Sequence, residues 1–467
     1  MSSPTTRHGG AAAADAVRPE ARPGIVFALV AAGVAMSNLD MFIVNVALPE
    51  IGGHYSGASL PELSWVLNAY AVVFAALMVP AGGFADRAGP RRAYLLGVTV
   101  FTAASVACAV SPDVWFLVAA RVVQAAGAAA LIPASLGLLL AATPPQRRVS
   151  AVRGWTAISG LAAALGPVAG GLLAQSDWRW VFLVNVPIGV VTLAAGFPLL
   201  PRPPALTDRS RPDLPGAVLL TIGVAALALG VVRSDEWGWT SPRVLGSLAV
   251  AAVLLALFAW RSARHPSPVV PPALLRLPAF GAATVANILF AVAFAAMLLS
   301  AVLWCQQVWH WSALRTGLAI SPGPLMVPGL AVGAAPLARR LGAGPPAFLG
   351  CVLFATGIGW WMWRMEDGYA TGMLPGMLLT GMGVGLTLPT LIGAAMSAVP
   401  PQHFSTGSAV VTMARQVGTV LGVAMLVAVL SAGEDAPGAF DAGWLGTVIV
   451  TVASALACLL LLRGRRA

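Results

Sequence analysis

Apolar residues along this chain gather into fourteen long runs, each separated from the next by a short polar, proline-rich or glycine-rich segment. A bilayer core about 30 Å thick needs roughly 20 apolar residues for one helical crossing, and each run comes close to or exceeds that length. The pattern predicts fourteen transmembrane helices and leaves no room for a soluble domain. We expect them at residues 24–48, 63–83, 91–110, 114–140, 150–174, 178–200, 213–232, 241–261, 279–304, 314–336, 345–363, 371–397, 405–431 and 441–462.

Composition agrees with an all-α polytopic membrane protein. Of the 467 residues, 58% are apolar and only 9% are charged, whereas soluble domains carry about 25% charged residues. This excludes a water-soluble globular protein, and the scarcity of charge also excludes an intrinsically disordered chain. Four cysteines are too few to cross-link a chain of this length, so a secreted disulfide scaffold is excluded as well.

The net charge of +10 indicates membrane topology rather than a nucleic-acid partner. All 27 basic residues are arginine, and with both termini in the cytoplasm 20 of them fall in cytoplasmic segments and five in external loops. That bias is the positive-inside rule, so we expect cytoplasmic termini and no nucleic-acid binding. Residues 1–23 and 464–467 are expected to be cytoplasmic tails, the first of them disordered and without a cleavable signal peptide.

The two ends of the chain resemble each other, which predicts an internal duplication. Offsets of 253 to 256 residues place three glycines of the first part on three of the last: Gly89 on Gly342, Gly127 on Gly383, and Gly166 on Gly422. We therefore expect one six-helix half at 24–200, two inserted helices with linkers at 201–276, and a second six-helix half at 277–463. Repeated halves facing a central cavity are typical of alternating-access transporters.

Three ionisable residues lie deep inside predicted helices: Asp40, Arg121 and Arg415. Each charge costs roughly 2.5–3.5 kcal/mol in a membrane, so each is a candidate for function. Asp40 and Arg121 are predicted at similar depths from the helical rise of about 1.5 Å per residue. A carboxylate shielded from water can be switched by a proton or a cationic ligand. Asp40 is our candidate switch; a structural salt bridge to Arg121 is the alternative.

Other polar residues in the helices are candidates for coupling or binding. Gln124 follows Arg121 by three residues, so the two share a helix face; Arg121 alternatively braces the fold. Arg415 either contributes to a cavity or is structural. Further candidates for the lining of a central cavity are Asn38, Phe42, Asn45, Asn68, Tyr70 and Asn287.

Two motifs rich in glycine predict moving or closely packed segments. In Asp86-Arg87-Ala-Gly89 the glycine permits a tight turn and the aspartate can cap the following helix, so this loop is a candidate gate. The alternative is a solvated loop whose arginines set topology. The second motif combines a proline kink with small residues that allow close helix packing, with or without a role in antiport: Gly166, Pro167, Gly170 and Gly171.

The sequence shows no residue pattern typical of a metal site or of an enzyme active site. The five histidines are scattered over the tail and the loops, and the four cysteines fall in four different predicted helices. No nucleophile, base and metal-ligand cluster is visible, so we expect neither an enzyme nor a metal site. We also expect no cofactor.

Several motifs in the right order resemble the fourteen-helix drug:proton antiporter branch of the major facilitator superfamily. They include LDMFIVNVALP (39–49), GGFADRAGPRR (82–92), RVVQAAGAAALIPAS (121–135), GLAAALGPVAGGLL (160–173) and WRWVFLVNVPIG (178–189). The resemblance implies the fold of that superfamily, a bacterial plasma-membrane location and a protein that acts as a monomer. It implies proton-coupled efflux of lipophilic or cationic drugs, with Arg121 tuning proton release from Asp40. An exporter dedicated to one endogenous metabolite, antibiotic or lipid is the alternative.

Overall fold

The computed structural model describes all residues except 1–22, 56–59, 203–212, 334–339, 433–435 and 463–467, so most of both predicted tails lies outside it. The described chain is helical and contains no strand. The first helices are α1 (Pro23–His54), α2 (Leu60–Ala88), α3 (Pro90–Ala109), α4 (Val114–Ala141), α5 (Arg148–Ala174), α6 (Trp180–Leu183) and α7 (Asn185–Leu199). They are followed by α8 (Leu214–Val232), α9 (Ser234–Trp237), α10 (Pro242–Ser262) and α11 (Pro272–Leu275). The last are α12 (Pro278–Leu303), α13 (Ala313–Ile320), α14 (Pro322–Gly333), α16 (Gly344–Arg364), α17 (Leu374–Ala398), α18 (Phe404–Ala432) and α19 (Ala436–Leu462).

Twelve helices of the described part are long and apolar enough to cross a membrane. A thirteenth candidate is α5, in which the segments Pro145–Ala163 and Val168–Ala174 are inclined to each other by 41°. In the crossing expected at 314–336 the structure describes the short helices α13 and α14, and residues 334–336 lie outside the described part. The multi-helix membrane architecture is therefore confirmed, whereas the count of fourteen crossings remains a prediction.

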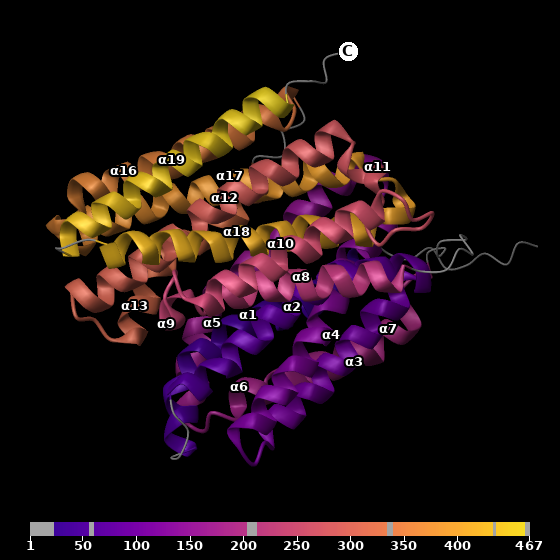
Figure 1. Ribbon diagram of the computed structural model, residues 1–467, viewed down its shortest axis with the longest axis horizontal. Coiled ribbons are helices and arrows are strands. Elements are labelled where there is room, and N and C mark those ends of the chain that lie inside the picture. The colour runs from indigo at the N-terminus through magenta and orange to yellow at the C-terminus, as the bar shows by residue number, and fades with distance from the viewer. Residues whose placement is uncertain (1–22, 56–59, 203–212, 334–339, 433–435, 463–467) are drawn as a thin grey trace, which may run out of the picture.

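The helices form two groups with an inserted pair against them. Figure 1 shows the early helices, in indigo and purple, below the late helices, in orange and yellow, with α8 and α10 in front. Helix α8 packs on both α2 and α18 and so touches both groups, while α10 packs on α8. Only 11% of the residues in the apolar 18-residue stretch of α10 are buried inside the protein, as expected for a helix that faces lipid.

One buried ion pair joins the two inserted helices. The Asp213 side chain is 0% exposed. It caps α8 by accepting a hydrogen bond from the N–H of Gly216, and it also accepts one from Nε of Arg261 at 2.6 Å. Arg261 lies in the last turn of α10. One carboxylate therefore satisfies the start of one helix and fixes the end of the other.

Equivalent glycines make equivalent helix contacts in the two groups. A Cβ on Gly127 of α4 would lie 2.7 Å from the Phe101 nitrogen of α3, and a Cβ on Gly383 of α17 would lie 2.6 Å from the Gly350 oxygen of α16. The turn glycines Gly89 and Gly342 both have positive φ, 93° and 79°. These repeated contacts occur at the offsets found in the sequence, although the boundaries of the two halves remain a prediction.

We predict that Gly127→Val destabilises the protein, because the side chain would meet the backbone of α3, which cannot move aside. Overpacking of this kind costs about 1–3 kcal/mol, so the thermal unfolding midpoint of purified protein should fall. Gly246→Val on α10 is the matched control, because a Cβ there meets nothing within 4 Å. Equal losses in the two variants would contradict the packing argument.

Candidate functional site

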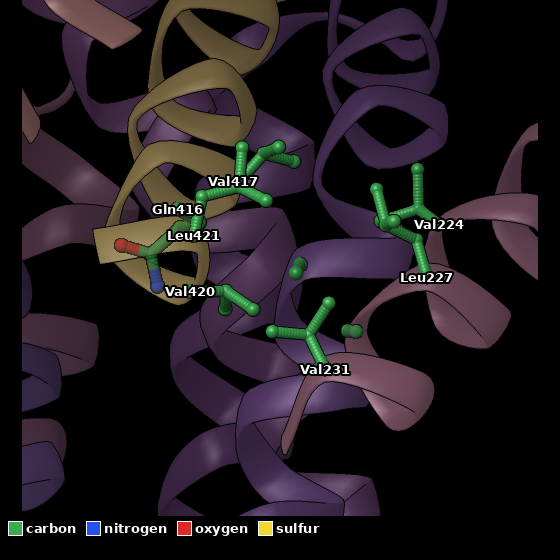
Figure 2. A pocket seen from close by; sticks show the side chains of 9 residues that line it. Val224, Leu227, Val231, Gln416, Val417, Val420 and Leu421 are labelled. Carbon is green, nitrogen blue, oxygen red and sulfur yellow. The ribbon is translucent and has the colours of Figure 1, made fainter. Parts of the chain in front are cut away.

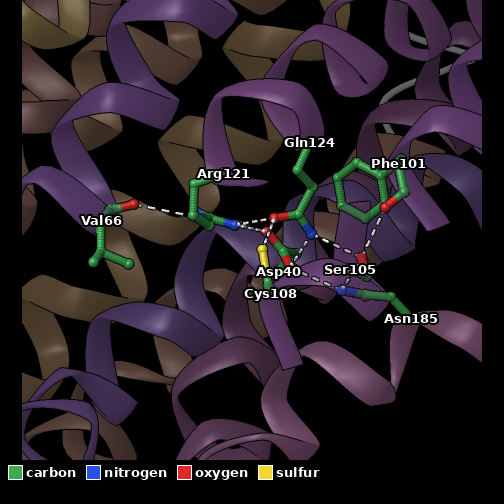
Figure 3. Close-up of polar contacts among 8 residues, drawn as sticks. All are labelled: Asp40, Val66, Phe101, Ser105, Cys108, Arg121, Gln124 and Asn185. Atoms are coloured by element: carbon green, nitrogen blue, oxygen red, sulfur yellow. Dashed lines mark hydrogen bonds and ion pairs between the residues drawn. The ribbon is translucent and has the colours of Figure 1, made fainter. Parts of the chain in front are cut away.

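A buried ion pair lies inside the first group of helices. Asp40 of α1 is 0% exposed and Arg121 of α4 is 1% exposed. Nη1 of Arg121 donates to Oδ2 of Asp40 at 2.5 Å, while Gln124 Nε2 and Asn185 Nδ2 donate to Oδ1 at 2.9 and 2.8 Å (Figure 3). An ionised carboxylate only accepts hydrogen bonds, so three donors around Asp40 fit its charged form.

A second layer holds Arg121 in place. Its Nη1 also donates to Gln124 Oε1 at 2.6 Å, and its Nε donates to the Val66 carbonyl at 3.2 Å. The guanidinium carbon lies 4.1 Å from the centre of the Tyr70 ring, a cation–π contact. Helices α1, α2, α4 and α7 therefore meet at this one charge pair.

Ser105 of α3 adds a fifth helix to the network. Its hydroxyl accepts from Gln124 Nε2 at 2.9 Å and from Asn185 Nδ2 at 3.3 Å, and it donates to the Phe101 carbonyl at 2.9 Å (Figure 3). The two amides that hold the Asp40 carboxylate are thus themselves held by one hydroxyl. The geometry fixes both amide orientations.

The hydrogen-bond pattern around Asp40 fits only its ionised form. Protonation of Asp40 removes the counter-charge of Arg121 and turns one carboxyl oxygen into a donor, so the three donors around it no longer match. Removing one partner of a buried ion pair leaves the other charge uncompensated at a cost of about 3–5 kcal/mol. Because Asp40 is 0% exposed, the network must open before water reaches the carboxyl group.

The sequence predicted part of this network. The structure brings Asp40, Arg121 and Gln124 into direct contact, while their roles in transport remain predictions. The sequence reasoning missed Asn185, although an amide within the apolar run Trp180–Leu199 is the kind of residue that marks an intramembrane site. Ser105 gave no such signal, because helical serines commonly bond their own backbone, as this one also does.

Several predicted cavity residues occupy other places. Tyr70 is 2% exposed and lies against Arg121, and Asn287 is 0% exposed and donates to the Val411 carbonyl at 3.2 Å, so neither side chain is open to solvent in this structure. Asn38 donates to the Val34 carbonyl of its own helix. Their place in a cavity remains a prediction, because a helical sequence alone does not show which neighbour each face meets.

The other residues predicted to line a cavity are closely packed, half-buried or outside the described part of the chain. Phe42 packs so closely on α5 that a Cβ on Gly166 would lie 2.5 Å from the Phe42 Cβ. Asn68 and Arg415 are half-buried. The side chain of Asn45 lies outside the described residues.

A small apolar pocket lies where the inserted helix meets both groups. Its walls come from α2, α8 and α18 (Figure 2), and they consist of Ala75, Val224, Leu227, Ala228, Val231, Gln416, Val417, Val420 and Leu421. Gln416 is the one polar residue of this lining, and its amide points away from the valines. The pocket thus offers apolar contacts, and no charged or hydrogen-bonding group of its lining points into it.

The predicted gate loop connects the two groups of helices. Asp86 is 6% exposed and accepts hydrogen bonds from the backbone N–H groups of Ser405 at 2.9 Å and Thr406 at 2.7 Å. It therefore caps α18, and not α3 as the sequence suggested; Gly89 precedes α3 without any side-chain cap. The first turn of α18 offers free N–H groups at the positive end of its dipole, whereas α3 begins with Pro90, which has no N–H to donate.

The neighbours of Asp86 strengthen the contact between α2 and α18. A Cβ on Gly82 would lie 2.8 Å from the Ser405 carbonyl, so the two helices touch at their backbones. Arg87 Nη2 donates to Ser267 Oγ at 2.5 Å, in the segment that follows α10. Opening this end of the molecule requires breaking the Asp86 bonds first.

The glycine-proline motif lies at the contact of α5 with α1. Gly166 and Gly170 are buried and Gly171 is half-buried. A Cβ on Gly166 would come 2.5 Å from the Cβ of Phe42 on α1, so close packing accounts for this glycine. The bend of α5 falls between residues 163 and 168, around the motif, whereas the side chain of Pro167 lies outside the described residues.

Within the described residues, no group of three or more metal-ligating side chains comes together. The cysteines Cys108, Cys305, Cys351 and Cys458 are buried and free. These observations offer no candidate metal centre in that part of the chain.

Comparison with known proteins identifies the family. A model described as Major Facilitator Superfamily matches residues 30–423. The Methylenomycin A resistance protein of Streptomyces coelicolor is 31% identical over 448 residues, which cover 92% of this chain and 91% of that protein. The Tetracenomycin C resistance and export protein of Streptomyces glaucescens is 33% identical over 413 residues, covering 87% of this chain and 75% of that protein.

A solved structure shares the fold. The human organic anion transporter MFSD10 (TETRAN) matches with a TM-score of 0.69 at 16% identity, over 93% of this chain and 99% of that chain. At this identity the match concerns the fold alone. Together with the family match, it means that this multi-pass helical membrane protein belongs to the Major Facilitator Superfamily.

Proposed function

We propose that this protein exports lipophilic small molecules across a bacterial plasma membrane by alternating access, in exchange for protons. The observation that carries the proposal is the sealed Asp40 carboxylate, paired with Arg121 and held by two amides. The proton gradient is the energy source, and no cofactor takes part. Fourteen crossings, cytoplasmic termini and a monomeric protein in the bilayer belong to the same proposal.

The relatives support the direction of transport. Proteins that share about a third of their residues with this chain are named for resistance to, or export of, antibiotics. Resistance conferred by a membrane carrier requires removal of the drug from the cell. The sequence shows no cluster of catalytic residues, which also favours a transporter over an enzyme.

The Asp86 contact supplies the alternating-access element of the proposal. With α2 and α18 joined through Ser405 and Thr406, the cytoplasmic end is closed, and the proposed cycle begins from this state. A proton that reaches Asp40 weakens its hold on Arg121, which lets the five helices around it shift. The shift releases the Asp86 cap, opens the cytoplasmic side and lets the proton leave inside the cell.

A second candidate is an exporter dedicated to one compound. It is favoured by one specific observation: two relatives are each named for a single antibiotic. A resistance panel in a host that lacks its own efflux pumps separates the two candidates. Broad resistance supports the polyspecific carrier, and resistance to one compound supports the dedicated one.

We predict that Asp86→Ala opens the cytoplasmic end, because α18 loses the cap of its first turn. Cysteines introduced by Gly83→Cys and Thr406→Cys report the closed state, since a Cβ on Gly83 lies 4.0 Å from the Thr406 Oγ1. Disulfide formation between them should slow several-fold in Asp86→Ala and remain fast in Asp86→Glu. Unchanged cross-linking in Asp86→Ala would refute the gate.

We predict that Asp40→Asn abolishes the dependence of transport on the pH gradient, because asparagine cannot exchange a proton. The measurement is uptake of the neutral fluorescent lipophile N-phenyl-1-naphthylamine into everted vesicles, with and without an imposed pH gradient. Asp113→Asn is the control, because Asp113 caps α4 and asparagine caps equally well. Full gradient-driven uptake by Asp40→Asn would exclude Asp40 as the coupling group.

A further inference from the structure

Arg415 lies in the middle of α18, far from either end of the helix. It is 11 residues beyond Phe404, or about 16 Å along the axis at 1.5 Å per residue. Successive residues turn by about 100°, which places Arg415 about 60° from Gly418, the residue that packs on Ile288 and Ala291 of α12. Ala409, on another face of α18, packs on Gly82 of α2. Arg415 thus points between α12 and the first group of helices.

No partner for the Arg415 guanidinium is found among the described residues. The ion pairs found there involve Arg121, Arg179, Arg261 and Arg364. Besides the backbone bonds of the helix, the hydrogen bond found at Arg415 in the described part of the chain is accepted by its backbone carbonyl, from the Thr419 hydroxyl. A half-buried cation at membrane depth without a counter-charge is unfavourable, and such residues commonly mark a binding or transport path.

Two buried polar groups on the same side of α18 also lack partners within the described chain. Asn287 donates to the carbonyl of Val411, one turn before Arg415, but its Oδ1 accepts nothing. Ser408 lies seven residues before Arg415, hence on the same face, and its hydroxyl has no partner. Asn287 is 0% exposed and Ser408 1% exposed, so bulk water does not satisfy them.

Helical geometry brings these groups toward one another. Long side chains on a helix lean toward its N-terminus, which carries the Arg415 guanidinium over Val411 and toward Ser408. Asn287 is already fixed at Val411 by its hydrogen bond. The guanidinium, the hydroxyl and the amide oxygen therefore belong to one side of α18, within about two turns of the helix.

The charges of the helices favour an anion there. The last six predicted crossings contain no embedded aspartate or glutamate, and Asp40 already has Arg121 as its partner. A cationic substrate has no free carboxylate to bind in the described core. An anion, in contrast, meets a guanidinium whose planar fork matches carboxylate-like oxygens.

We infer that Arg415, with Ser408 and Asn287, forms a binding subsite for an anionic group, a carboxylate, phenolate or sulfonate, on an otherwise lipophilic substrate. In the occupied site Arg415 and Ser408 donate to the anion, and Asn287 Oδ1, which accepts nothing in the structure, accepts from the guanidinium and orients it. The inference rests on the proposed export function and replaces the cationic substrate class expected from the sequence. Export of an anion is also favoured by a membrane potential that is negative inside.

The test compares two probes of nearly equal shape, 2-naphthalenesulfonate and the neutral 2-naphthalenesulfonamide, in everted vesicles. Arg415→Gln should lower sulfonate uptake about tenfold, the usual loss when a charge-assisted hydrogen bond is removed, and leave sulfonamide uptake nearly unchanged. Arg415→Lys should retain part of the sulfonate uptake, because it keeps the charge but loses the fork. Gln416→Ala, at the neighbouring position, is the control and should keep the wild-type preference.

A binding measurement separates failure of this inference from failure of the export proposal. In purified full-length protein, sulfonate should raise the unfolding midpoint of the wild type but not of Arg415→Gln. Arg415→Gln without probe should be at least as stable as the wild type, because it removes an unpaired charge. If vesicles transport neither probe while sulfonate still raises the unfolding midpoint of the wild type, the export proposal fails and the anion subsite stands. Equal effects on both probes, or a strongly destabilised Arg415→Gln, would overturn the anion subsite.

Discussion

The ion pair of Asp40 and Arg121 constrains the whole first half of this protein. A carboxylate and a guanidinium removed from water need several hydrogen-bond partners, because the membrane supplies none. The partners come from α1, α2, α3, α4 and α7, so these five helices can pack together only in an arrangement that satisfies both charges. In the proposed mechanism a proton on Asp40 changes that requirement, and the packing of the five helices then couples to the proton.

Helix α18 connects the three elements of the proposed mechanism. Its N-terminus is held by Asp86 of α2, its middle carries Arg415, and its glycines Gly418 and Gly422 pack directly on the backbone of α12. In the proposed mechanism α18 moves as one rigid helix, so a movement at Arg415 also moves the helix start that Asp86 holds. The proton site and the proposed anion subsite then lie in different halves and communicate through helix positions rather than by competing for one carboxylate.

The sequence predicted the helices well because membrane burial produces long apolar runs that polar segments interrupt. It also pointed to Asp40, Arg121 and Gln124, since polar groups in such runs are rare. It did not predict that Asp86 caps α18, because the partner lies 319 residues away and any helix start attracts a carboxylate. Nor did it predict the contact of Tyr70 with Arg121, since that contact depends on how α2 packs against α4.

The central claim, that Asp40 is the group that takes up the proton, is tested most directly by infrared spectroscopy of the purified protein in lipid. Acidification protonates other carboxyl groups as well, so the comparison is with Asp40→Asn: the wild type should show one additional carboxylic-acid C=O band that Asp40→Asn lacks. The band should persist in Asp213→Asn, which alters another buried carboxylate paired with an arginine. The same band in Asp40→Asn, or no band in the wild type, would contradict the account.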